Sequence, residues 1–282
     1  MTHRMTKPRP DFAVIGAMRA GTTQLYELLR QHPGICVPQM KETDFFCSHK
    51  SVARGLDWYW RQFSDEGALW GDISPNYAKT DVNPDAAALL HDANPDMKLF
   101  FIARDPVDRA VSHYNMAQLV GDTPGDPHRL LSSWSGKHIL HASQYYTCLL
   151  PFWERFGEQI TILDFDTLVR APDTVIAKMC EALGIEHIPT KTKPASENSL
   201  DDVARRPVWW HKLRRTPLGT ELRGRVPRPL LNMAKRHVAR RYTAAKTQAL
   251  PEAIRDAMAE RLSGDASRFR QETGLSFDRW SV

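Results

Sequence analysis

The stretch Asp11–Arg30 constrains the fold more than any other part of the chain, because it joins an apolar run, a glycine turn and an amphipathic segment. The run that ends at Gly16 predicts a buried strand, and the leucines that follow Gly21 at helical spacing predict a helix with one buried face. Between them, Gly21, Thr22 and Thr23 would direct backbone N–H groups, hydroxyls and the positive end of the helix at one point. Such a turn suits a phosphate or sulfate group.

The spacing of Gly16 and Gly21 matches the nucleotide P-loop, G-x-x-x-x-G-K-[ST], but Thr22 stands where that motif has its lysine. The nearby cation is Arg19 instead. Without the lysine, the turn is poorly suited to the β- and γ-phosphates of ATP, so we expect it to hold another phosphate ester. A glycine turn between a strand and a helix also occurs as packing alone in α/β folds, and this alternative stays open.

The composition is that of an ordinary globular protein, with 282 residues, 42% hydrophobic and 25% charged. We expect one domain over residues 1–282. Apolar runs reach only five residues, as in Leu99–Ala103, far short of the roughly 20 that span a bilayer. Residues 1–10 are not followed by a secretory signal pattern, so we expect a cytoplasmic protein. Its scattered cysteines are predicted to be free thiols: Cys36, Cys47, Cys148 and Cys180.

The net charge of +5 hides one strongly basic segment. Residues 205–246 contain 13 Lys or Arg and one acid, Glu221, so the rest of the chain is acidic. Three interpretations remain open for this segment: a solvated lid over an acceptor site, a membrane-surface helix in peripheral contact with lipid, or a site for an anionic saccharide. The chain has no recognised nucleic-acid-binding motif, so we expect no nucleic-acid partner.

Strand and helix patterns alternate along the chain. Further strands are predicted at Leu69–Ile73, Met97–Ile102 and Ile160–Phe165. Helices are predicted from Asn83 or Asp85, from Pro106 after an Asp105 cap, from Ser143, and over Pro172–Leu183 before Gly184, whereas Gly121–Gly136 is predicted to be a loop. The aromatic cluster of Trp58, Tyr59, Trp60 and Phe63 is predicted to be core. The alternation predicts a single-domain, P-loop-like α/β fold with a central, mostly parallel sheet flanked by helices and ligands at the carboxyl ends of its strands.

At these residues the chain resembles the sulfotransferases that use 3′-phosphoadenosine 5′-phosphosulfate (PAPS), especially bacterial members and the heparan sulfate group. Arg19-Ala-Gly-Thr-Thr23 is similar to their 5′-phosphosulfate loop, [K/R]-x-G-T-T. Arg104 after a strand, with Ser112 on the next helix, resembles their 3′-phosphate site. The resemblance implies a sulfotransferase with PAPS as donor, 3′-phosphoadenosine 5′-phosphate (PAP) as product and no metal requirement.

The resemblance also implies a set of site residues. Glu42 would be the general base, with Arg19 and Lys41 as catalytic cations. Glu42 paired only with Lys41 or Arg19 is the alternative. Lys41 would replace a lysine that heparan sulfate members have in the segment Gly71–Tyr77, where this chain has Ile73. Tyr145 would contact the adenine or belong to the core, and Lys193 would reach the phosphates. The full donor-binding set is Arg19, Ala20, Gly21, Thr22, Thr23, Gln24, Arg104, Ser112, Tyr145 and Lys193.

Two other functions remain open. One is a P-loop kinase that uses ATP and magnesium. No paired aspartates are placed like a magnesium site behind the loop, but Asp72 and Asp164 near strand ends leave such a site open. The other is a non-catalytic protein that binds an anionic lipid or polymer through residues 205–246. For a sulfotransferase, we expect the acceptor to be a hydroxyl or amine of a small molecule, a lipid or a saccharide.

Overall fold

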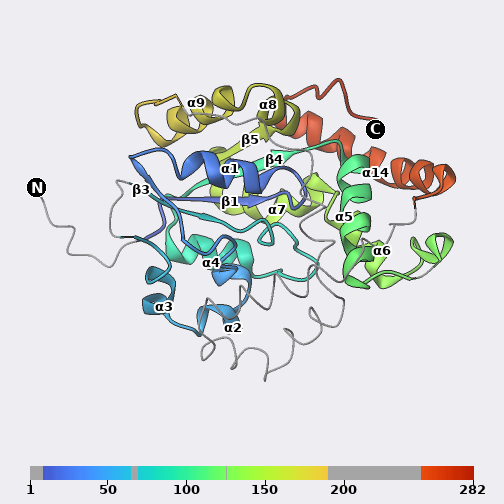
Figure 1. Cartoon of the computed structure of the whole chain (residues 1–282), viewed down its shortest axis with the longest axis horizontal. Helices are drawn as coiled ribbons and strands as arrows, with labels where there is room; N and C mark the ends of the chain where they lie inside the picture. The colour runs from blue at the N-terminus through green and yellow to red at the C-terminus, as the bar shows by residue number, and fades with distance from the viewer. Residues whose placement is uncertain (1–8, 65–68, 125, 190–248) are drawn as a thin grey trace, which may run out of the picture. The chain divides into compact units, whose positions relative to one another are not determined.

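The computed structural model describes residues 9–64, 69–124, 126–189 and 249–282 (Figure 1). The chain divides into two compact units. The first unit comprises residues 1–110, 140–195 and 257–282, and the second comprises residues 111–139 and 196–256. The expected single domain over residues 1–282 stays a prediction.

The first unit is built on a sheet of five parallel strands in the order β2-β3-β1-β4-β5. The strands are β1 (Phe12–Gly16), β2 (Ile35–Cys36), β3 (Leu69–Ile73), β4 (Lys98–Ala103) and β5 (Ile160–Asp164). Phe12 in β1 pairs with Gly71 in β3 on one side and with Lys98 in β4 on the other. The predicted α/β fold with a central parallel sheet is confirmed.

Helices flank both faces of this sheet. Those of the first unit are α1 (Thr22–Leu29), η1 (Phe45–Cys47), α2 (His49–Val52), α3 (Leu56–Trp60), α4 (Ala86–Ala93), α7 (Tyr145–Phe156), η3 (Gly157–Gln159), α8 (Phe165–Arg170), α9 (Pro172–Leu183) and most of α14 (Glu252–Thr273). Helices α1, α8 and α9 lie on one face of the sheet, and α4 and α7 lie together on the other (Figure 1). A parallel sheet requires such crossover helices between its strands.

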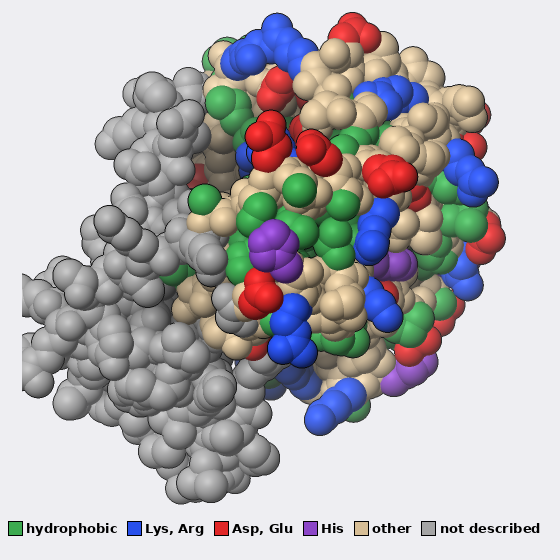
Figure 2. All heavy atoms as spheres, turned by 90° about the vertical axis from the view of Figure 1, so that its right-hand side faces the viewer, with side chains coloured by type: hydrophobic (Ala, Val, Ile, Leu, Met, Phe, Trp, Pro, Cys, Tyr) green, Lys and Arg blue, Asp and Glu red, His purple; other side chains and the backbone are tan. Residues whose placement is uncertain are grey.

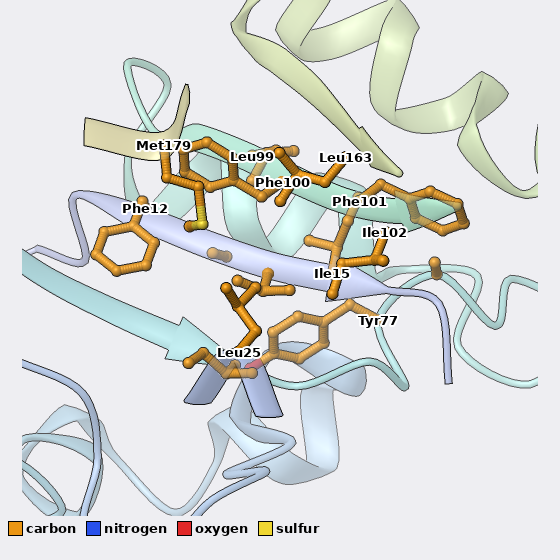
Figure 3. Close-up of a cluster of buried hydrophobic side chains, with 14 of the residues drawn as sticks. Phe12, Ile15, Leu25, Tyr77, Leu99, Phe100, Phe101, Ile102, Leu163 and Met179 are labelled. Atoms are coloured by element: carbon orange, nitrogen blue, oxygen red, sulfur yellow. The ribbon is translucent and has the colours of Figure 1, made fainter. Parts of the chain in front are cut away.

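The two central strands are buried on both faces, as their continuous apolar sequences predict. Figure 3 shows side chains of β1 and β4 packed with Leu25 of α1 and Met179 of α9. The ring of Phe12 meets that of Phe100 edge-on, with their centroids 5.9 Å apart. The aromatic cluster around Tyr59 is also part of this core, as predicted, and Tyr59 itself is fully buried. The core therefore holds the carboxyl ends of the strands in one fixed layer.

Several helices were not predicted, among them α6 (Trp134–His141), α8 and the 22-residue α14. Helix α8 has only six residues, too few to show a periodic pattern, and it begins because the Asp164 carboxylate accepts the backbone N–H of Thr167 at 2.9 Å. The predicted loop Gly121–Gly136 is partly wrong, because it contains η2 (Pro127–Arg129) and the start of α6. Ser133 caps α6 by accepting the N–H of Gly136 at 3.1 Å. The capping hydrogen bond allows a helix to begin in this segment, although its glycine and proline residues favour a loop.

Helix α5 (Pro106–Val120) begins in the first unit and belongs to the second unit from Val111 onward. The described part of the second unit also contains η2 and most of α6. On α6, Trp134 is 71% exposed and its ring stacks on that of His138 with centroids 5.2 Å apart. The basic segment 205–246, with its three open interpretations, lies outside the described residues.

Acidic and basic side chains are intermixed on the surface that Figure 2 shows, around a patch of hydrophobic side chains. This mixture agrees with the sequence, in which the large basic excess is confined to residues 205–246. Among the helices that the structure describes, none is both long enough and apolar enough to cross a bilayer.

We expect Gly71→Ala to destabilise the protein by about 1–3 kcal/mol, because a methyl group there overpacks the core. A Cβ at Gly71 would lie 1.9 Å from Cζ of the Phe12 ring, which is fully buried and has no room to move aside. Urea unfolding followed by circular dichroism measures the change. Gly264→Ala on α14 is the matched control, because among the described residues no atom outside the adjoining backbone of α14 lies within 4 Å of its Cβ position. That variant should be equal to the wild type or more stable. Equal effects of the two substitutions would contradict this packing account.

Candidate functional site

The loop from Gly16 to Thr23 leaves the carboxyl end of β1 and is held by its own backbone and by β4. The Ala17 N–H donates to the Ile102 carbonyl at 3.1 Å, and the Ala20 N–H donates to the Ala17 carbonyl at 3.1 Å. Gly21 has a φ of +82°, in the left-handed region that favours glycine. A Cβ there would also come within 3.0 Å of the Leu168 side chain. Glycine therefore lets this turn pack tightly on α8.

The positive end of α1 opens directly from this loop. Gly21 occupies the cap position without a side-chain acceptor, and no acidic residue lies in the first turn of α1. The first N–H groups of a helix have no acceptor within it, so this end favours an anion. Thr22 is buried, whereas Thr23 is exposed. Gln24 fixes the helix in place, because its Nε2 donates to the Leu168 carbonyl of α8 at 3.1 Å.

Arg19 and Arg104, predicted from two separate motifs, meet in the structure. Arg19 is half-buried with a φ of +71°, and its carbonyl accepts a hydrogen bond from Nη1 of Arg104 at 3.0 Å. The Arg104 guanidinium lies 4.7 Å from the centroid of the Phe165 ring. The backbone carbonyl of Arg104 accepts a hydrogen bond from the Tyr145 hydroxyl at 2.8 Å. The carboxyl ends of β1 and β4 thus hold two cations beside one loop.

Arg109, which the sequence analysis missed, supports the same loop from inside the protein. Its side chain is fully buried on α5, where Nε donates to the Ser143 hydroxyl at 2.6 Å and Nη1 donates to the Met18 carbonyl at 3.4 Å. Ser143 in turn donates to the Pro106 carbonyl at 2.8 Å. Periodicity gave no signal for this role, because an arginine in an amphipathic helix is normally assigned to its exposed face.

The cations around the loop repel one another. Burial, and then the neighbouring Arg104, lower the pKa of Arg19. Burial lowers the pKa of Arg109 to about 10, with Arg104 and Arg19 contributing in the same direction. Burial and then Arg109 lower the pKa of Lys79 to about 8. Like charges held together in a partly desolvated site destabilise their charged forms, and a bound anion relieves that cost. The arrangement favours a ligand with several negative charges.

The segment Lys41–Phe46 carries two carboxylates with different surroundings. Glu42 is exposed over 40% of its side chain and forms an ion pair with Lys41, as the alternative interpretation of Glu42 expected. Asp44 is half-buried and accepts two hydrogen bonds from Nδ2 of Asn76, each at 3.1 Å. Burial raises the pKa of Asp44 to about 6 against the opposing effect of Asn76, with Glu42 and Asp72 raising it further. The sequence analysis missed Asp44, because a single Asp before a Phe pair has no distinctive spacing.

The buried Asp72 at the end of β3 anchors this segment to the sheet. Its carboxylate accepts hydroxyl hydrogen bonds from Thr43 at 2.6 Å, Ser74 at 2.8 Å and Tyr77 at 2.6 Å. Burial raises its pKa, although each of these hydrogen bonds opposes the shift. Asp164, the other aspartate for which the kinase alternative left a magnesium site open, caps α8. Within the described ranges, no group of three or more His, Cys, Asp or Glu side chains could hold a metal ion.

Three predicted donor contacts remain: Tyr145, Ser112 and Lys193. Tyr145 is only 1% exposed, and its ring packs edge-on against Phe101, Phe269 and Trp280, so the core interpretation accounts for its position. Ser112 lies on the part of α5 that belongs to the second unit. Lys193 lies outside the described residues. The proposed ligand contacts of all three stay predictions.

The chain is similar in sequence to known sulfotransferases. The chain is 32% identical over 185 residues to heparan sulfate glucosamine 3-O-sulfotransferase 5 of Mus musculus, covering 60% of this chain and 52% of that protein. It is 32% identical over 157 residues to the membrane-associated sulfotransferase kil1 of Dictyostelium discoideum, covering 53% of this chain and 31% of that protein. The chain thus spans about half, or less, of the length of these curated relatives.

A solved structure and a family profile extend the comparison. The crystal structure of a sulfotransferase from Alicyclobacillus acidocaldarius superposes with a TM-score of 0.58 at 25% identity, covering 71% of this chain and 91% of that one. The family profile of the sulfotransferase domain matches residues 9–206, well over half of the chain. The loop after β1 and the cations around it lie within that match. This chain therefore belongs to the sulfotransferase domain family.

Proposed function

We propose that this protein transfers a sulfuryl group from PAPS to a hydroxyl or amine of an acceptor. The observation that carries the proposal is the group of cations around the open N-terminus of α1, where Arg19, Arg104 and Arg109 contact one loop. Burial and the neighbouring arginines lower the pKa values of Arg19 and Arg109. Membership of the sulfotransferase domain family supports the same reaction. We propose no metal requirement, because a monoanionic sulfate ester needs less charge neutralisation than a nucleoside triphosphate.

The donor would bind along the loop between β1 and α1. The N-terminal N–H groups of α1, the Thr22 and Thr23 hydroxyls and Arg19 would hold the 5′-phosphosulfate, with Ala20, Gly21 and Gln24 shaping the turn. Arg104, with Ser112, would bind the 3′-phosphate, which ATP lacks. Lys193 and Tyr145 are proposed as further donor contacts.

The reaction would be an in-line displacement. The acceptor oxygen or nitrogen forms a bond to sulfur while the bond between sulfur and the bridging phosphate oxygen breaks, and PAP leaves with the resulting negative charge. Cations at the loop would stabilise that charge as it develops. Glu42 would take the proton that the acceptor loses, and Lys41, its ion-pair partner, would stay close to the reacting group.

The acceptor is proposed to be a saccharide, a lipid or another small molecule. Heparan sulfate appears in the names of several relatives, which supports a saccharide. A membrane-associated relative supports peripheral contact with lipid, for which residues 205–246 carry the positive charge. We propose that the protein is cytoplasmic and that it associates with membranes through this peripheral contact.

Arg104→Ala should remove the energetic contribution of the 3′-phosphate to nucleotide binding. We expect the affinity for PAP to fall about 10- to 100-fold, because a charge-assisted hydrogen bond contributes about 1.5–3 kcal/mol. The affinity for adenosine 5′-monophosphate, which has no 3′-phosphate, should change far less. Isothermal titration calorimetry without added metal measures both affinities.

The matched control for Arg104→Ala is Arg61→Ala, which removes an exposed arginine just after α3. This variant should bind both nucleotides like the wild type. If Arg104→Ala instead lowers the affinity for both nucleotides equally, the substitution disrupts the loop, because it removes the hydrogen bond to the Arg19 carbonyl. Magnesium-dependent ATP turnover with no PAP binding would favour the kinase alternative.

Glu42→Gln should lower turnover about 100-fold or more while PAP affinity stays within about twofold, the pattern of a lost general base. Turnover is measured as PAP release from PAPS with a panel of saccharide, lipid and phenol acceptors. Asp44→Asn is the comparison variant, because it keeps the size of a neighbouring carboxylate side chain and removes its charge.

If Asp44→Asn lowers turnover and Glu42→Gln does not, the general base is Asp44. In that case, wild-type turnover would decline as the pH falls through about 6, because the base must be ionised and burial raises the pKa of Asp44 to that value.

A further inference from the structure

Lys79 lies in the turn that follows β3, directly beside the start of the loop from Gly16 to Thr23, where the donor is proposed to bind. The preceding residue, Ala78, donates its N–H to the Ile15 carbonyl of β1 at 3.0 Å. A Cβ placed on Gly16 would lie 3.1 Å from the Cβ of Ala78. The turn is held in shape by its own hydrogen bonds, since the Lys79 N–H donates to the Asn76 carbonyl at 3.1 Å. The backbone of Lys79 is therefore held next to the point where the loop leaves the sheet.

Four charged groups act electrostatically on the Lys79 ammonium, and it is bonded to none of them. The charged groups that act on it are Arg109 from α5, Asp44 and Glu42 from the segment Lys41–Phe46, and Asp81 from its own turn. In the part of the chain that the structure describes, the side chain of Lys79 makes no hydrogen bond or ion pair. A half-buried ammonium without a direct partner destabilises the protein unless a ligand compensates it.

Lys41, the other lysine considered for the sulfuryl group, is in a different situation. It already forms an ion pair with Glu42. Strand β3 ends in Ile73, which is fully buried and apolar and so supplies no cation. Lys79 thus combines a position at the loop, partial burial and an ammonium that has no bonded partner among the described residues.

We propose that Lys79 is a catalytic cation that binds the sulfuryl group of the donor and stabilises it as it passes to the acceptor. This inference rests on the proposed sulfotransferase function and adds a residue to it. In the displacement, the bond between sulfur and the 5′-phosphate oxygen breaks, and the ammonium would interact with the sulfuryl oxygens as that bond lengthens. Lys79 gains or loses no covalent bond, and its proton stays on nitrogen.

PAPS and PAP differ only in the sulfuryl group, so their two affinities isolate the contribution of Lys79 without an identified acceptor. We expect Lys79→Met to weaken PAPS binding about tenfold or more, as for a lost charge-assisted contact, and to change PAP binding less than about threefold. Isothermal titration calorimetry measures both affinities, and thermal unfolding verifies that the variant is folded. Lys50→Met, on the exposed surface of α2, is the matched control and should leave both affinities unchanged.

A pH series gives a second readout. The pKa of Lys79 is lowered to about 8, so its positive charge is present below that pH and is lost above it. The preference of the wild type for PAPS over PAP should therefore shrink as the pH rises through about 8. Lys79→Arg keeps its charge at every pH of the series and should preserve the preference.

Each other outcome overturns the inference. If Lys79→Met weakens the binding of PAPS and of PAP equally, or weakens neither, Lys79 does not bind the sulfuryl group. In that case, PAP binding that depends on Arg104 would still support the proposed function. If Lys41→Met alone abolishes the preference for PAPS, Lys41 is the sulfuryl cation. If the wild type binds neither nucleotide, the proposed function and this inference both fail.

Discussion

The candidate site depends on one fully buried guanidinium. Arg109 joins the loop after β1, through the Met18 carbonyl, to the hydroxyl of Ser143 just before α7, and Ser143 joins both to the start of α5 at Pro106. A buried arginine is stable only where protein acceptors replace its lost water, and here those acceptors belong to elements far apart in the sequence. The charge at the centre of this arrangement cannot be neutralised at ordinary pH, so it orders the loop and makes its surroundings positive at the same time.

The parallel sheet explains why the remaining site residues converge. Loops that follow parallel strands emerge at the same edge, so the ends of β1, β3 and β4 bring together Arg19, Asp72 and Arg104. The two signs of charge are separated within this edge. Cations surround the loop between β1 and α1, while the carboxylates of Asp44 and Asp72 are fixed by hydroxyl and amide groups around the end of β3. This separation suits a reaction in which an anionic donor binds on one side and a proton leaves on the other.

Most of the fold could be predicted from the sequence, since it depends on local patterns. The apolar runs located β1, β3, β4 and β5 to within a residue or two, and Pro106 and Gly184 correctly bounded α5 and α9. The helix α14 was not predicted, and neither was the short α8, which has six residues and a single capping aspartate. For the site, motif spacing found Arg19 and Arg104. It missed Arg109, Asp44 and Lys79, because nothing in their neighbouring residues marks them as buried or as close to the loop.

By itself, the sequence determined the order of strands and helices, the glycine turn before Thr22 and the identity of the cations available to it, because these depend on side-chain chemistry and on spacing along the chain. The tertiary structure decided which charges are buried, which are paired and which converge. Glu42 is exposed and paired with Lys41, whereas Lys79 is half-buried beside the loop. The physical reason is that burial and electrostatic interaction depend on distances between segments that the sequence holds tens of residues apart, and only packing of the sheet brings those segments together.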